Sequence, residues 1–388
     1  MGNITYTNER ILATITPEQT VDLLVAPALL LANPLANDMR IFRIYQNVKG
    51  KKKIAILQNA FSVMRAPVTC EWKPYHKAEW SGREWSLCRF QIQTELCKEE
   101  YEGCLELLEG DGVATHDPLA GGVDALTIAY LDFIKLNLQR DIAQWIWFGD
   151  EDFGTNDYVW RMLEDMIEPS EFEGLKATYN RECNGIWRTI FELATNGEIK
   201  NQVQAVSAAA DATKPSDVEA FFDTMLKHAP SRLTALRSSA PDQRPAFLVQ
   251  PDIFEAYWSA LATRCACAEN QYVIEGTPIS GVLTYKGYPV IAMYEWQNFD
   301  ETIGAMGTQS KSMNQRAIFT TRGNNANLAI MHSAAEINDG VGFMVEQGSL
   351  KDSFKVYMQA DFKLGTGIVD PSLIVFATNI DGLDPNSL

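Results

Sequence analysis

The chain has 388 residues, of which 46% are apolar and 21% are charged, so wholesale disorder and a collagen-like structure are excluded. This length corresponds to two or three domains at about 150 residues each, and it can bury a core without disulfide or metal staples. The 50 acidic and 33 basic residues give a net charge of −17, which excludes strong non-specific binding to nucleic acid through the overall charge.

The seven cysteines are odd in number and irregularly spaced, which is a poor disulfide framework. We therefore expect reduced thiols that pack as small hydrophobic side chains. The apolar stretch 21–32 contains Asp22, has no basic cluster before it and is too short to span a bilayer. Together these features predict a soluble intracellular protein.

The first 90 residues are predicted to be extended. Residues 1–40 hold short apolar runs broken by three prolines, which favours an arm that lies over another surface. Residues 41–90 contain strand-like runs at 54–57 and 85–92 around a loop.

Charge is segregated between two neighbouring segments. Residues 41–90 carry ten basic and three acidic residues, a net charge of +7, whereas residues 91–121 carry one basic and eight acidic residues, a net charge of −7. Two interpretations stay open at this point. The segments are either two solvated surfaces, or a basic element of one copy that lies against an acidic element of a neighbouring copy.

The clearest helical pattern runs over residues 122–148, where apolar residues recur in steps of three and four and Gly149 follows as a stop signal. Its 26 residues from Val123 to Phe148 would span about 39 Å, which indicates a structural backbone. Further helices are predicted over 158–167, 187–194 and 253–263.

Capping signals define two helix starts. Ser216 and Glu219 have capping-box spacing ahead of the apolar face that begins at Val218. Asp252 is the predicted N-cap of the helix 253–263.

The second half of the chain also contains strand signals. Residues 281–285 and 288–292 read as a hairpin about Lys286-Gly287, and 317–320 and 328–330 flank a turn at Gly323. Residues 354–364 alternate between apolar and polar, which is typical of a half-buried antiparallel strand. Gly365-Thr-Gly367 is predicted to turn the chain into a final strand, 373–377.

No residue is assigned a catalytic, cofactor-binding or metal-binding role. Cys265 and Cys267 have no second cysteine pair or histidine nearby, so buried thiols are the default interpretation. The loop with Asp150, Glu151, Asp152 and Asp157 lacks EF-hand spacing and is predicted to be solvated. The glycines of 276–281 resemble a phosphate loop, but Val282 and Leu283 occupy the positions of its lysine and hydroxyl residue.

The order of elements resembles the major capsid protein of tailed bacteriophages, the HK97-like fold. Trp147-Phe-Gly-Asp150 with Gly174-Leu175 is similar to that family's segment after its spine helix. Phe247-Leu-Val-Gln-Pro-Asp252, Lys286-Gly-Tyr-Pro-Val290 and Val369-Asp-Pro371 each match a short family pattern. The resemblance covers about residues 41–378, and it rests on the order of these short motifs along the chain.

The resemblance implies an α+β chain with four parts. These are an N-terminal arm (1–40), an extended β-hairpin called the E-loop (41–90), a peripheral domain (91–194 and 336–388) with spine helix 122–148, and an axial domain (195–335). No long charged coiled segment precedes them, which implies a separate scaffold or none, and no residue maps onto the family's cross-linking chemistry.

The implied function is a non-enzymatic shell protein that forms hexamers and pentamers of an icosahedral phage head around double-stranded DNA. Implied partners are further copies of the chain, packaged DNA without sequence-specific contact, and candidate scaffold, portal and decoration proteins, with no membrane. The implied location is the virion, after assembly in the host cytoplasm. The alternatives are an encapsulin-type nanocompartment shell and an acidic, tryptophan-rich hydrolase whose nine tryptophans line a sugar cleft.

Overall fold

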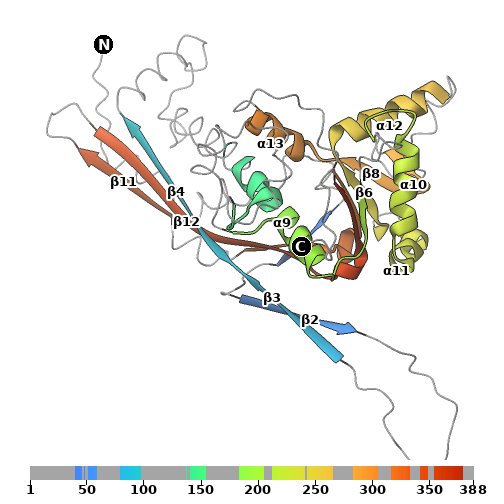
Figure 1. Cartoon of the computed structure of the whole chain (residues 1–388). Coiled ribbons are helices and arrows are strands. Elements are labelled where there is room, and N and C mark those ends of the chain that lie inside the picture. Colours follow the sequence, from blue (N-terminus) through green and yellow to red (C-terminus); the bar gives the residue numbers. More distant parts are fainter. Residues whose placement is uncertain are drawn as a thin grey trace, which may run out of the picture.

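The computed structural model describes these residues: 40–45, 48, 51–58, 79–97, 137, 140–153, 183–204, 212–240, 243–264, 283–304, 316–332, 341–347 and 354–378. In this part of the chain the fold mixes helices with a five-stranded sheet, a six-stranded sheet and a two-stranded hairpin (Figure 1). The predicted α+β class is confirmed.

The five-stranded sheet is organised around the long strand β12 (Phe354–Ile368). Three strands pair with it antiparallel: β4 (Cys88–Cys97), β10 (Leu328–His332) and β11 (Val341–Gln347). A fifth strand, β1 (Phe42–Tyr45), joins β10 in parallel. At about 3.3 Å per residue, the 15 residues of β12 span about 50 Å. Figure 1 shows β4, β11 and β12 running together away from the helices.

The predicted turn at Gly365-Thr-Gly367 is wrong, because both glycines lie inside β12. A Cβ at Gly367 would lie 2.4 Å from the indole ring of Trp85, and one at Gly365 would lie 2.7 Å from the backbone oxygen of Ser86. The glycines therefore allow a close approach of the Trp85 segment to the strand. The chain turns later, at η8 (Pro371–Leu373), where the Asp370 carboxylate accepts a hydrogen bond from the Ser372 amide at 2.9 Å.

The six-stranded sheet lies under two helices. Its strands in spatial order are β5 (Gln202–Gln204), β13 (Ile374–Thr378), β9 (Ala317–Thr320), β6 (Ala246–Val249), β8 (Tyr288–Ala292) and β7 (Leu283–Tyr285). The predicted hairpin is confirmed: Lys286 and Gly287 have φ of 49° and 84°, as a tight two-residue turn requires. The predicted strands 317–320 and 328–330 both form, but they belong to different sheets, so η7 (Gly323–Asn325) connects the two sheets.

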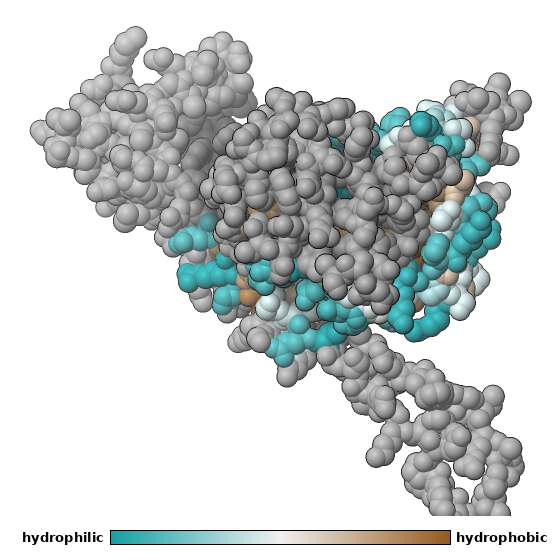
Figure 2. Space-filling view, viewed as in Figure 1, coloured by the Kyte–Doolittle hydropathy of each residue, from teal (hydrophilic) through white to brown (hydrophobic). Residues whose placement is uncertain are grey.

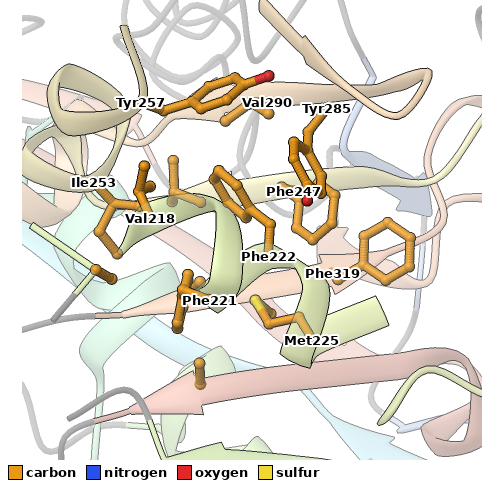
Figure 3. Close-up of a cluster of buried hydrophobic side chains, with 14 of the residues drawn as sticks. Val218, Phe221, Phe222, Met225, Phe247, Ile253, Tyr257, Tyr285, Val290 and Phe319 are labelled. Atoms are coloured by element: carbon orange, nitrogen blue, oxygen red, sulfur yellow. The ribbon is translucent and has the colours of Figure 1, made fainter. Parts of the chain in front are cut away.

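The core of this region is aromatic. Phe222 of α10 (Val218–His228) has its ring 4.9 Å from that of Phe247, 5.4 Å from Tyr257 of α12 (Pro251–Arg264) and 5.1 Å from Tyr285. Figure 3 shows these side chains between the helices and the sheet. Phe247 also stacks on Phe319 at 4.4 Å, so the rings link α10, α12 and three strands into one layer.

Both predicted helix caps are corrected by the structure. Asp217, rather than Ser216, is the N-cap of α10 and makes no side-chain cap hydrogen bond. Ser216 lies in a preceding turn, in which the Lys214 carbonyl accepts the Asp217 and Val218 amides. Helix α12 begins at Pro251, which needs no amide partner, so Asp252 lies in its first turn.

A second aromatic cluster joins helices to both sheets. Residues 137 and 140–148 are helical, in agreement with the end of the predicted helix 122–148. Residues 122–136 and 138–139 and the predicted helix 158–167 lie outside the described residues. The ring of Trp147 lies 5.4 Å from Phe42 of β1 and 5.1 Å from Trp296 of α13 (Tyr294–Gly304). Trp296 in turn lies 5.3 Å from Trp187 of α9 (Ile186–Thr195), the helix predicted over 187–194.

A charged pair is buried beside this cluster. Arg316, which is 0% exposed, forms an ion pair with Asp300 of α13 and lies 4.9 Å from the centre of the Phe148 ring. The Gln250 side-chain amide donates to Asp300 at 2.7 Å. Burial raises the pKa of Asp300, while Arg316 and Gln250 oppose the rise because they stabilise the carboxylate.

One cysteine pair contradicts the expectation that all seven thiols are reduced. Cys88 at the start of β4 forms a disulfide with Cys183 before α9, with the Cα atoms 5.9 Å apart. The residues are 95 positions apart in sequence, so spacing alone did not reveal the pair. The fold brings them together because β4 and the start of α9 pack on the same part of β12.

We expect that replacing both Cys88 and Cys183 by Ser lowers the free energy of unfolding by about 2–4 kcal/mol under oxidising conditions, because the bond closes a long loop. Urea unfolding followed by circular dichroism measures the difference, and added reductant should remove it. Cys97→Ser is the matched control and should leave the redox dependence intact. A wild-type stability that does not change with reductant would contradict the disulfide.

We expect Arg316→Met to destabilise the chain by about 3–5 kcal/mol, since it leaves the Asp300 carboxyl buried without its cation. Adding Asp300→Leu should recover most of the loss, which a double-mutant cycle of urea unfolding measures. In Arg316→Met alone the pKa of Asp300 rises further, so the loss in free energy of unfolding should be largest near neutral pH. This loss should shrink as the pH falls toward the pKa of an aspartate in the unfolded chain. A loss that does not depend on pH would argue against a buried carboxylate.

Candidate interaction surfaces

The acidic loop after the helix 140–148 is attached to the core through one buried carboxylate, while Glu151 is exposed. Asp150 is 0% exposed, and the Arg188 guanidinium donates to Asp150 at 3.1 Å and to Asp152 at 2.9 Å. The prediction of a solvated loop is therefore wrong for Asp150, because α9 places a cation against it. Asp157, Cys265, Cys267 and 276–281 lie outside the described residues, and among the residues that are described no cluster of metal ligands occurs.

The tryptophans of the described chain are mostly core residues. Trp145, Trp147, Trp187 and Trp296 are each at most 1% exposed. Side chains buried to this extent cannot stack on a sugar, so these four do not form the cleft that a glycoside hydrolase needs. Trp258 on α12 is different, since it is 43% exposed.

A two-stranded hairpin projects from the rest of the described chain (Figure 1). Its strands β2 (Lys51–Gln58) and β3 (Glu79–Ser86) pair antiparallel, with Lys51 opposite Ser86 and Gln58 opposite Glu79. The predicted strand 54–57 lies within β2, but the predicted strand 85–92 is divided at Leu87 between β3 and β4. The division occurs where the chain changes its partner from β2 to β12.

Contacts at the base of β3 attach the hairpin to the body. Arg83 forms an ion pair with Glu198, which follows α9. Trp85 is 8% exposed and packs with Val48, Ala329 and Met331. A polar cavity of about 420 Å³ lies beside these contacts, lined by Arg83, Asn184, Glu192, Glu198 and others. Sequence reasoning missed this attachment because Arg83 and Glu198 are 115 positions apart.

The turn between β7 and β8 carries an exposed polar cluster. The Tyr285 hydroxyl donates to Asp223 of α10 at 2.7 Å, and the Lys286 ammonium also contacts this carboxylate. Hydrogen bonds from Lys286 and Tyr285 lower the pKa of Asp223, whereas burial and the Asp223 carboxylate raise the pKa of Tyr285. This cluster fixes the hairpin turn against α10.

Comparison with known proteins gives a match by structure only. No family model and no curated protein matches the sequence. The structure is similar to a chain of the satellite phage P4 procapsid that includes the size determination (Sid) protein, with a TM-score of 0.51 and 9% identity over 95% of this chain and 93% of that chain.

Two further similarities have TM-scores under 0.5. A structure from Mycobacterium phage Ogopogo has a TM-score of 0.44 and 9% identity, over 89% of this chain and 91% of that chain. The SrpI encapsulin complex from Synechococcus elongatus has a TM-score of 0.42 and 11% identity, over 88% of this chain and 85% of that chain. The procapsid match covers nearly the full length of both chains, so this chain has a phage capsid fold, and the resemblance seen in the sequence is confirmed at the level of the fold.

Proposed function

We propose that this chain is the major capsid protein of a tailed bacteriophage. In this proposal it assembles through hexamers and pentamers into an icosahedral head that encloses double-stranded DNA. The observation that carries the proposal is the fold shared with a phage procapsid chain across 95% of this chain and 93% of the other. A projecting hairpin and a strand of about 50 Å support it, because a shell subunit has to reach over its neighbours.

We also propose the division into N-terminal arm (1–40), E-loop (41–90), peripheral domain (91–194 and 336–388) and axial domain (195–335). The hairpin β2–β3 would form the projecting part of the E-loop, and α10, α12 and β6–β8 would belong to the axial domain. Two strands connect the domains under this division. β10 pairs with β12 of the peripheral part, and β13 pairs with β9 of the axial part.

The proposed role needs no active site. The buried charged and aromatic groups discussed above hold the fold together, as Arg316 with Asp300 and Arg188 with Asp150 illustrate. The net charge of −17 suits a shell that encloses DNA without adhering to it, since like charges repel. No described helix is long and apolar enough to cross a membrane.

The proposal further includes a virion location after assembly in the host cytoplasm. Its partners would be other copies of the chain and packaged DNA without sequence-specific contact, with scaffold, portal and decoration proteins as candidates.

We expect the purified chain to form capsomers or closed shells, seen by negative-stain microscopy and sedimentation. Monomers of 43.4 kDa only, across salt and protein concentration, would overturn the proposal. Particles isolated from the producing cell should contain DNA. Particles that instead enclose a cargo enzyme would identify a nanocompartment shell, and turnover of a polysaccharide by monomers would identify a hydrolase.

We expect charge reversal at Lys51, Lys52 and Lys53 of β2 to impair assembly while leaving circular dichroism and melting of the monomer unchanged. The hairpin projects from the body, and several weak, salt-screened pairs repeated at each subunit add up. Reversal of Glu99, Glu100 and Glu102, which lie outside the described residues, to Lys should restore part of the assembly.

The matched control for this prediction replaces Lys51, Lys52 and Lys53 by Gln. Assembly of the Gln variant should be impaired less than that of the Glu variant, and it should depend less on salt. Normal shells from the Glu variant would show that the lysines are only solvated. A melted monomer would show that the hairpin belongs to the core of its own chain.

A further inference from the structure

Three exposed basic residues, here called the basic face, lie at the end of α10 and on the short elements that follow it. Lys227, Arg232 and Arg237 are exposed, and no acidic residue occurs between positions 227 and 240. Arg232 belongs to α11 (Ser231–Ala235) and its side chain is 73% exposed, with Asp370 at 3.8 Å as a weak partner. Arg237 of η3 (Leu236–Ser238) lies over the Tyr288 ring at 5.9 Å, which holds its position. This basic face is notable in a chain with a net charge of −17.

An acidic face lies on the outer side of α12. Asp252, Glu255 and Trp258 are exposed at steps of three residues, so they share one side of the helix. The other side of α12 is buried through Ile253, Ala256 and Tyr257. Trp258 remains 43% exposed, which is unusual for the largest apolar side chain.

The two faces are separated within one chain. Figure 1 places α11 and α12 at opposite ends of α10, whose 11 residues span about 16 Å. Figure 2 shows hydrophilic residues along the side of the molecule where these elements lie. At this separation exposed charges are largely screened from one another at physiological salt, so the two faces do not satisfy each other intramolecularly.

We propose that the acidic face of one copy docks on the basic face of the next copy. The inference deepens the proposed capsid function, on which it rests, by naming the contact that joins neighbouring subunits. Copies with a net charge of −17 repel each other, so a stable contact has to match opposite charges locally. Asp252 and Glu255 supply the anions, Arg232 and Arg237 supply the cations, and an arginine over Trp258 adds a cation–π contact.

The symmetry of the contact follows from its two different faces. A contact between unlike faces is head-to-tail, and it generates a closed ring when the rotation between copies closes. Each copy then uses both faces, one toward each neighbour.

The test reverses each face separately. Asp252→Lys with Glu255→Lys reverses the acidic face, and Arg232→Glu with Arg237→Glu reverses the basic face. Each variant alone should lose ring formation, with about tenfold weaker association at each contact, measured by native mass spectrometry and negative-stain microscopy. All four changes in one chain should restore rings. A mixture of the two single-face variants should form only rings with an even number of subunits, because the variants must alternate.

Controls separate charge from folding. Arg232→Lys with Arg237→Lys keeps the charge and should assemble. If lysine in the first turn of α12 melts the helix, Asp252→Asn with Glu255→Gln tests the same contact without adding positive charge there. Circular dichroism of every variant checks the monomer.

The outcomes distinguish the inference from the proposed function. If each single-face variant forms rings like the wild type, this contact is overturned and the capsid function stands. If the single-face variants fail but neither the combined chain nor the mixture recovers, the faces do not dock on each other. If the wild type itself never assembles, the capsid function fails, and the contact fails with it.

Discussion

The packing of Trp147 against Trp296 is the contact on which the arrangement of the two sheets depends. Trp147 also touches Phe42 of the five-stranded sheet, and Trp296 lies in the first turn of α13, the helix that follows β8 of the six-stranded sheet. Through Trp187 the cluster reaches α9, whose Phe191 lies 6.2 Å from Phe376 of β13. Large rings dominate core energetics through the area that they bury, so this cluster can hold five distant chain segments in one geometry.

Around that cluster the charged groups take two different roles. Arg316 with Asp300 and Arg188 with Asp150 are buried and fix the positions of α13, α9 and the loop at Asp150. The removal of one partner from such a pair is costly, whereas the intact pair adds little net stability because its charges lose their hydration. The exposed charges on α11 and α12 differ in sign, and in the proposed assembly they make the contacts between copies.

A body with projecting elements accounts for the proposed function better than a cleft does. The hairpin β2–β3 is attached at its base by Arg83, Trp85 and the nearby disulfide, so its direction is set by the body. The fold match to a phage procapsid chain shows that these features belong to a phage capsid fold. Function would then reside in surfaces repeated by symmetry rather than in a single pocket.

The sequence by itself determined the local elements. The alternation of 354–364 predicted β12, Lys286-Gly287 predicted the β7–β8 turn, and the order of short motifs predicted the capsid fold. Only the tertiary structure decided which segments meet: Gly367 under Trp85, Cys88 beside Cys183, Asp150 against Arg188, and β9 and β10 in different sheets. Periodicity and turn chemistry report the conformation of neighbouring residues, whereas these contacts join positions tens to hundreds of residues apart and depend on how the whole chain packs.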